Sequence, residues 1–286
     1  TSILSAAVGG LAGGNLNLNF KANQNERLQN LFFVGKDIKA AKAKFDYLVK
    51  KGKITQEEAD TIIEQAEAVS NTTTEIPSWM QDSPEEIIQS AVILNRIKKL
   101  EADKKNLAKI YHAEVDKEIE SAYDELNTLK EKAAKQLAAK EAEVVTNIAG
   151  KENVDTYNSI EEMKAAGIDE SELNSDGIME KDGKIIINLA VAARTKAISV
   201  GSHELLHRVL RSELKNNKAM PEIINQFREI LKTNGALENI ENKLKYGISQ
   251  GNYDITFNED GSVSGADIDE YITFFSDAVS KNEIPF

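Results

Sequence analysis

Residues 182–210, DGKIIINLAVAARTKAISVGSHELLHRVL, decide the fold of the second half of the chain. Lys181-Asp182-Gly183 joins residues 178–180 to the isoleucine-rich residues 184–188. This pattern predicts a β-hairpin, because an Asp-Gly turn suits the tight connection between antiparallel strands. Residues 191–214 are helix-prone, and their apolar face would be supplied by Ile198, Leu205, Leu206, Val209 and Leu210. We therefore predict a hairpin followed by a helix.

The predicted helix carries the motif His203-Glu204-Leu205-Leu206-His207, which contains two of the three histidines of the chain. Residues four apart lie on one face of a helix, so both imidazoles can reach one metal ion. We expect a zinc cofactor held by His203 and His207. Glu204 would be the catalytic base, which takes a proton from water and passes it to the leaving amine. The alternative is a surface helix with incidental histidines, which the scarcity of histidine disfavours.

The hairpin strand and the helix with its HExxH motif together resemble the minimal fold of the zincin metallopeptidases. In that family an edge strand beside the active-site helix binds the extended substrate, so the resemblance implies a peptide or protein substrate. Metzincins continue the motif with a glycine and a third histidine, but no histidine follows His207 in this chain. The gluzincin pattern remains, in which a glutamate on a later helix completes the zinc site.

Glu270 is the best candidate for that third ligand. It belongs to residues 267–277, DIDEYITFFSD, where a charged group beside an aromatic face needs a partner. Asp277 lies two turns further on the same side and could hold a ligand in place. The alternative is a capping box, with Asp267 as the cap and Glu270 at the third position. The gluzincin glutamate motif usually has an acid one turn later, where this chain has Phe274. The other acids that could serve as ligand are Asp269, Glu229 and Glu241.

The first half of the chain is predicted to be helical. Residues 1–20 are rich in glycine and small side chains, so we expect a flexible start. Helices are predicted over residues 25–50 and 55–70, the second beginning with a capping box between Thr55 and Glu58. Between Pro84 and about residue 142 no glycine or further proline occurs, and apolar residues recur every 3.5 residues or so. This pattern predicts one very long helix or a helical hairpin.

The pattern changes near residue 143, where residues 143–148 suggest a strand and residues 159–166 a short helix that ends at Gly167. We therefore expect a predominantly helical α+β protein. Its parts would be the flexible start (1–20), an elongated helical region (21–142) and a small zincin-like metallopeptidase domain (143–286). Residues 258–262 resemble part of a calcium loop, but the last ligand position would fall on Asp267 rather than a glutamate, so a hairpin turn is expected.

Composition restricts the classes of function. The formal net charge of -12 argues against binding to nucleic acid or to an anionic membrane. The chain has no cysteine, so disulfides and thiolate metal sites are excluded. The apolar residues 3–11 are too few to span a bilayer. We expect a location in the cytoplasm or in a virion.

The long helices rich in Lys, Glu and Ala, together with residues 53–60, KITQEEAD, resemble segments of large tailed-phage virion and polyvalent proteins. The resemblance implies virion protein partners along these helices. The chain starts at Thr1 rather than at a methionine and stops at Phe286, so we expect it to be a piece of a larger precursor. Two functions follow. The first is a zinc-dependent endopeptidase, and the second is a structural or cargo virion protein in which the HExxH site is stabilising or vestigial. A toxin-like effector protease is a third alternative.

Overall fold

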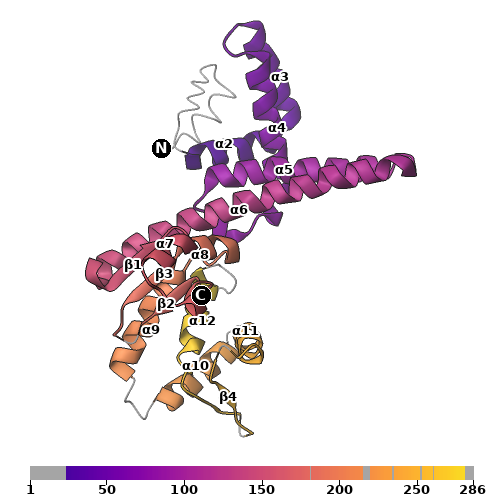
Figure 1. The fold of residues 1–286 in the computed structure, drawn as a ribbon. Coiled ribbons are helices and arrows are strands. Elements are labelled where there is room, and N and C mark those ends of the chain that lie inside the picture. Colours follow the sequence, from indigo (N-terminus) through magenta and orange to yellow (C-terminus); the bar gives the residue numbers. More distant parts are fainter. Residues whose placement is uncertain are drawn as a thin grey trace. The chain divides into compact units, whose positions relative to one another are not determined.

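The computed structural model describes residues 24–180, 182–214, 220–233, 235–251, 253–259 and 261–280. The chain divides into two compact units, Thr1–Ala133 and Ala134–Phe286, whose elements are labelled in Figure 1. Helices predominate and the strands form two small sheets, which confirms the predicted α+β class. The flexible start predicted for residues 1–20 lies outside the described residues. Short 3₁₀ turns connect several elements: η1 (Thr73–Glu75), η2 (Ser78–Met80), η3 (Lys109–Tyr111), η4 (Lys151–Asn153) and η5 (Glu170–Glu172).

The described part of the first unit starts with the helices α2 (Gln24–Gly35), α3 (Ile38–Lys50) and α4 (Gln56–Thr72). The single helix predicted over residues 25–50 is wrong. The chain turns at Asp37, whose carboxylate accepts a hydrogen bond from the backbone N–H of Ala40 at 3.0 Å and so starts a new helix. The three helices share one apolar core with the following helix, and its buried members include Leu31, Phe45, Ile62, Val69 and Ile88.

The capping box predicted for α4 is confirmed. Thr55 Oγ1 accepts the backbone N–H of Glu58 at 3.1 Å, and Glu58 Oε2 accepts the backbone N–H of Thr55 at 2.7 Å. Two of the amide groups that a helix start leaves without partners are thereby satisfied.

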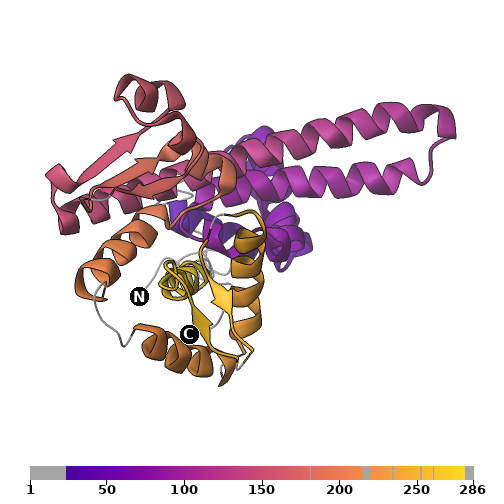
Figure 2. The ribbon, with the colours of Figure 1, turned by 60° about the horizontal axis from the view of Figure 1, so that its bottom comes forward.

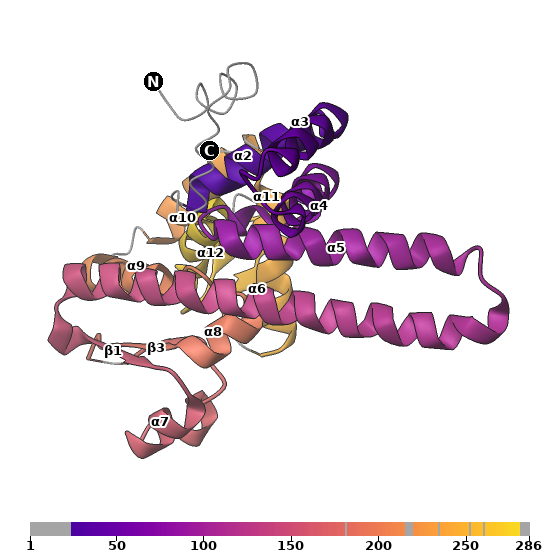
Figure 3. The same ribbon diagram turned by 90° about the horizontal axis from the view of Figure 1, so that it is seen from above.

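Of the two structures predicted between Pro84 and residue 142, one very long helix or a helical hairpin, the protein forms the hairpin. Helix α5 (Pro84–Lys104) and helix α6 (His112–Ala149) run side by side in opposite directions (Figures 2 and 3). Arg96 and Glu125 form a 2.8 Å ion pair between them, and Lys104 pairs with Asp116 near the turn. The chain therefore reverses within residues 105–111 rather than continuing as one helix.

Residues 143–148 are the last turns of α6, so the strand predicted there is wrong. Ala138, Ala142 and Val145 are spaced to lie on one helical face, and all three are buried in the core beneath the sheet. Burial on that face outweighs the local preference of β-branched residues for strands. As a consequence the division between the two units falls within α6, at Ala133–Ala134, and not at residue 143.

The second unit contains a three-stranded sheet with the order β1-β3-β2. Strand β3 (Ile185–Asn188) is central and wholly buried, parallel to β1 (Val154–Tyr157) and antiparallel to β2 (Gly177–Met179). The predicted hairpin is therefore confirmed, and its edge strand is β2. Helix α7 (Ile160–Ala165) is the short helix predicted over residues 159–166, whereas strand β1 was not predicted.

Two helices, not one, follow β3. Helix α8 (Leu189–Thr195) ends at Lys196, which has a φ of 60° and donates its backbone N–H to the carbonyls of Ala192 and Ala193. This left-handed cap redirects the chain before α9 (Val200–Leu214) begins. The continuous helix predicted over residues 191–214 is therefore wrong, although the HExxH motif lies on a helix as expected.

The start of α9 is held by a side chain from α6. Glu141 accepts hydrogen bonds from the backbone N–H groups of Gly201 and Ser202, each at 2.9 Å. A Cβ atom at Gly201 would lie 3.1 Å from both Ile187 Cδ1 and Val145 Cγ2, so the glycine permits this close packing. A carboxylate at a helix N-terminus also interacts favourably with the helix dipole.

We expect Glu141→Ala to lower the free energy of unfolding by about 0.5–2 kcal/mol, the range found for loss of a helix cap. The two N–H groups of α9 would lose their acceptor. The measurement is chemical denaturation, with Glu143→Ala as the control, because Glu143 is exposed on the same helix. Equal effects of the two substitutions would contradict the capping role of Glu141.

The chain after α9 forms a lobe with its own core. Helices α10 (Met220–Thr233) and α11 (Leu237–Ser249) precede the hairpin of β4 (Thr256–Phe257) and β5 (Val263–Ser264), and α12 (Glu270–Ser280) follows. The β4–β5 hairpin is the turn expected in place of a calcium loop. The most buried large side chains of this core are Ile224, Leu231, Ile240, Leu244 and Tyr271.

The second unit thus has two lobes, which we call the sheet lobe (residues 134–214) and the C-terminal lobe (residues 220–280). Among the described residues, no cluster of buried apolar side chains includes members of both lobes. Helices α9 and α12 are in direct contact and join them. In the part of the chain that the structure describes, no helix has the length and apolar character needed to cross a lipid bilayer.

Candidate metal centre

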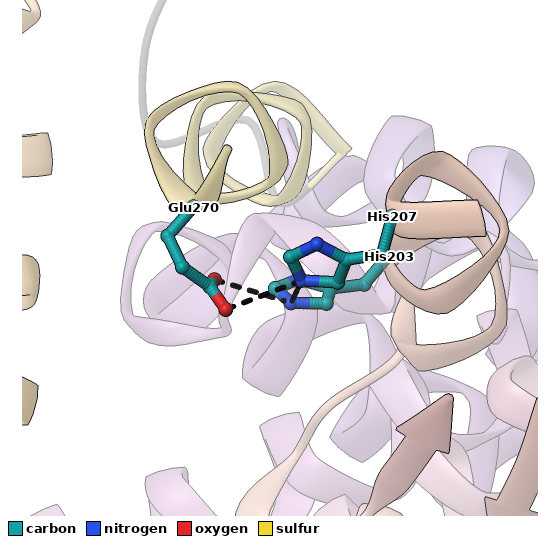
Figure 4. Close-up of side chains that lie close together, drawn as sticks. All are labelled: His203, His207 and Glu270. Atoms are coloured by element: carbon teal, nitrogen blue, oxygen red, sulfur yellow. Dashed lines mark hydrogen bonds and ion pairs between the residues drawn. The ribbon is translucent and has the colours of Figure 1, made fainter. Parts of the chain in front are cut away.

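Helices α9 and α12 bring the three predicted metal ligands together (Figure 4). The Nε2 atoms of His203 and His207 are 3.0 Å apart. Glu270, the first residue of α12, faces them, with Oε2 3.5 Å from His203 Nε2 and Oε1 3.2 Å from His207 Nε2. The three side chains therefore converge on one point between the two helices.

A carboxylate from the C-terminal lobe fixes the outer nitrogen of each imidazole. His203 Nδ1 donates to Asp277 Oδ2 at 3.0 Å, and His207 Nδ1 donates to Asp269 Oδ2 at 2.7 Å. An ionised carboxylate only accepts hydrogen bonds, so both Nδ1 atoms carry the hydrogen and both Nε2 lone pairs point inward. Two lone pairs at 3.0 Å repel each other unless a cation, either a proton or a metal ion, lies with them.

The distances fit a zinc ion. Two ligands bound to tetrahedral zinc at the usual bond lengths lie about 3.3 Å apart. The two Nε2 atoms are 3.0 Å apart, and each lies 3.2 or 3.5 Å from a different oxygen of Glu270, so all three separations are close to that value. Two imidazoles and one carboxylate are also a donor set that zinc accepts, and three protein ligands leave a position for water or substrate. His207 and Glu270 are only 4% and 6% exposed, as expected for groups that share a buried ion.

Burial and charge together set the protonation of these groups in the metal-free protein. Burial lowers the pKa of His203, but its hydrogen bonds with Asp277 and Glu270 outweigh burial and raise the pKa to about 11. Burial also lowers the pKa of His207, but the hydrogen bonds of His207 with Asp269 and Glu270 have the larger effect and raise that pKa to about 9. Burial raises the pKa of Glu270, but the two histidines lower it to about 2. A metal ion therefore competes with protons, and its affinity should fall as the pH is lowered.

Glu204 lies beside this cluster and has the properties of a proton acceptor. It is 9% exposed. Burial raises its pKa, and the nearby histidines only partly oppose that effect. A raised pKa brings a carboxylate closer to the pH at which it can both take and release a proton.

Strand β2 approaches Glu204 closely because residue 177 is a glycine. A Cβ atom at Gly177 would lie 2.6 Å from Val200 Cγ2 and 2.7 Å from Glu204 Oε1. Because Gly177 has no side chain, the carboxylate of Glu204 can occupy the space where a Cβ atom would otherwise lie.

We expect Gly177→Ala to displace Glu204. If the chain has the peptidase activity that its sequence predicts, turnover of a peptide substrate should fall by about tenfold or more, because small displacements of catalytic groups have large effects. Zinc content should remain at the wild-type level, since the atoms nearest to the added Cβ belong to Val200 and Glu204 and not to a ligand of the metal. Enzyme assays and metal analysis test this, with Gly183→Ala at the β2–β3 turn as a stability control. Unchanged turnover in Gly177→Ala would contradict the positioning of Glu204 by β2.

A cleft of about 680 Å³ opens onto the cluster. Residues 174–179, which include β2, form one wall of the cleft, and α9, Tyr253 and Phe274 contribute to the rest. Ile178 lines the cleft and also packs against the core cluster that contains Met163. Strand β2 is an edge strand whose residues line the cleft, whereas β3, the isoleucine-rich strand of the zincin resemblance, is central and buried.

The remaining predicted acids have other partners. Asp267 does not form the capping box: its Oδ2 accepts the backbone N–H of Asp254, and Glu270 donates its own N–H to the backbone carbonyl of Asp267. Asp269 accepts a hydrogen bond from Nδ1 of His207, on the side of the ring away from the cluster, and is not placed as a ligand. Glu241 pairs with Arg228 at 2.5 Å, and Glu229 lies 3.9 Å from Lys232.

The sequence reasoning missed two residues that contact the carboxylates, Ser199 and Arg211. Both could have been found, because Ser199, His203, His207 and Arg211 follow one another at intervals of four residues and therefore share one helical face. Asp277 was predicted as a partner, and the structure places it against His203.

Comparison with known proteins adds no relative: no family model, no curated protein and no solved structure matches the chain.

Proposed function

We propose that this protein is a zinc-dependent endopeptidase of gluzincin type. His203, His207 and Glu270 would hold the ion, and Glu204 would act as the base. The observation that carries the proposal is the convergence of two inward-facing Nε2 atoms, 3.0 Å apart, on the Glu270 carboxylate. The likeness of the hairpin and the HExxH helix to zincins supports the same activity.

Each part of the site has a role in peptide hydrolysis. Zinc, when bound, would supply a Lewis acid for the scissile carbonyl and for water. Glu204 takes a proton from the attacking water and delivers it to the leaving amine, and burial equips it to hold that proton in between. Tyr253 lines the cleft, and burial together with the neighbouring carboxylates raises the pKa of its hydroxyl, so it stays a neutral hydrogen-bond donor. The free edge of β2 offers backbone groups to an extended peptide.

The direct test is cleavage of a mixed peptide library by purified protein with a measured zinc content. We expect one zinc ion per chain and cleavage that stops when a chelator removes the metal. The His203→Ala/His207→Ala double variant should lose both zinc and activity. Stoichiometric zinc without cleavage of peptides or unfolded proteins would refute the peptidase assignment and leave a metal-binding role.

That metal-binding role is the second candidate, in which the protein is a structural or cargo virion component and the ion stabilises it. The observation in its favour is that the two lobes have separate apolar cores, so an ion between α9 and α12 would join them. We would then expect zinc removal to lower the melting temperature of a protein that cleaves nothing. The location in a virion, and protein partners on the α5–α6 hairpin, rest on the resemblance of the long helices to phage proteins.

A further inference from the structure

Four residues at equal spacing on one face of α9 point toward α12. Ser199 immediately precedes the helix and accepts the backbone N–H of His203 at 2.9 Å, as a helical residue would. His203 and His207 follow, and Arg211 is one turn beyond His207. The two metal-site histidines are thus flanked by one hydrogen-bond donor on either side.

The N-terminal flank holds the carboxylate behind His203. Ser199 Oγ donates to Asp277 Oδ1 at 2.8 Å, while Oδ2 of the same carboxylate accepts from His203 Nδ1 at 3.0 Å. Both oxygens of Asp277 are therefore bound from the α9 side. This two-point attachment fixes the rotation of the carboxylate and, through it, the plane of the imidazole.

The C-terminal flank holds the carboxylate behind His207. Arg211 Nε donates to Asp269 Oδ2 at 3.1 Å, and the same oxygen accepts from His207 Nδ1 at 2.7 Å. The side chain of Asp269 is 4% exposed. A carboxylate so far from water needs a charged partner, and Arg211 provides it.

These contacts matter because no core of buried apolar side chains joins the two helices in the described part of the chain. Helix α9 belongs to the sheet lobe and α12 to the C-terminal lobe, and no buried apolar cluster among the described residues spans both. The register of α12 on α9 is therefore set chiefly by the polar groups between them.

We infer that Ser199 and Arg211 are positioning residues, which anchor Asp277 and Asp269 and so arrange both imidazoles before the metal binds. The inference rests on the metal site of the proposed function, but it does not require peptidase activity. Residues that orient metal-bound histidines typically change metal affinity by about 10–100-fold when they are removed. Ser199 and Arg211 act one step further out, through those partners.

The test measures zinc dissociation constants by competition with a chelator. We expect Arg211→Ala to raise the dissociation constant by about tenfold, toward the lower end of the range for outer partners. Arg211→Lys should restore part of the loss, because a lysine keeps one charged donor. Arg208→Ala is the matched control: Arg208 lies on the same helix, and the Nη1 atom of its guanidinium has no hydrogen-bond partner among the described residues.

A double-mutant cycle separates positioning from a general effect on stability. If Arg211 acts through Asp269, Arg211→Ala should add little to Asp269→Asn but should keep its full effect in the Asp277→Asn background. Ser199→Ala should add little to Asp277→Asn but should keep its full effect in the Asp269→Asn background. This second series tests the inference even if an arginine variant does not fold. Absorption spectra of the cobalt-substituted proteins report the ligand geometry independently of activity.

The outcomes are distinct. A wild-type protein that binds zinc tightly, with Arg211→Ala and Ser199→Ala unchanged or with additive effects throughout the cycle, overturns the inference alone. A wild-type protein that binds zinc but cleaves nothing overturns the peptidase proposal alone. Absence of zinc binding in the wild type overturns both.

Discussion

Glu204→Gln is expected to abolish peptide cleavage while zinc stays bound. The amide has the shape of the carboxylate and fits beside Gly177, but it cannot take a proton from water. Loss of general-base catalysis lowers turnover by about 10²–10⁴-fold. The ligands His203, His207 and Glu270 are untouched, so metal analysis should still find the wild-type amount of zinc.

The control for this substitution is Glu161→Gln, which changes an exposed acid of α7 in the same lobe and should leave turnover unaltered. Turnover should be measured with a fluorogenic peptide taken from the cleaved members of the library. Near-normal turnover by Glu204→Gln would show that another group takes the proton, and Glu204 would lose its role as the catalytic base.

Glu270→Gln should weaken zinc binding more than any loss of an outer partner, that is, by more than the roughly 10–100-fold that such losses produce. The substitution removes a negative charge that faces both Nε2 atoms at 3.2 and 3.5 Å. The readout is again the zinc dissociation constant. If Glu270 served only to start α12, its replacement would lower the free energy of unfolding by about 1 kcal/mol and leave zinc affinity intact.

Two other acids serve as controls for Glu270. Glu229→Gln changes an acid that the sequence left open as a ligand but that lies against Lys232. Asp267→Asn changes the residue that the capping-box alternative required. Zinc affinity that falls in Glu229→Gln and holds in Glu270→Gln would contradict the ligand set.

The sequence predicted the local half of the site better than the distant half. His203, Glu204 and His207 are placed by helical periodicity alone, so the common face of the two histidines follows from their spacing. Glu270 had to be chosen among several acids. Asp269 and Glu270 are neighbours in sequence, yet one faces the back of His207 and the other its Nε2. Which of the two residues faces the Nε2 atoms depends on how α12 packs on α9, and a local sequence pattern does not predict that packing.

The errors in the fold have the same origin. Residues 143–148 contain β-branched side chains that favour a strand locally, but Val145 continues the buried face of α6. The turn at residues 105–111 contains neither glycine nor proline, and the hairpin is held by contacts such as Arg96–Glu125 between distant residues. Lys196 adopts a left-handed conformation that non-glycine residues seldom take, so nothing local marked the end of α8.

The separate interiors of the sheet lobe and the C-terminal lobe have a thermodynamic consequence. Parting them at the α9–α12 contact would hydrate charged and hydrogen-bonding groups and rather little hydrocarbon, so the accompanying change in heat capacity would be small. The apolar core of each lobe would stay buried. If the protein is the peptidase proposed above, a bulky polypeptide could enter, and its fragments leave, by a hinge-like separation of the two lobes in which neither lobe unfolds.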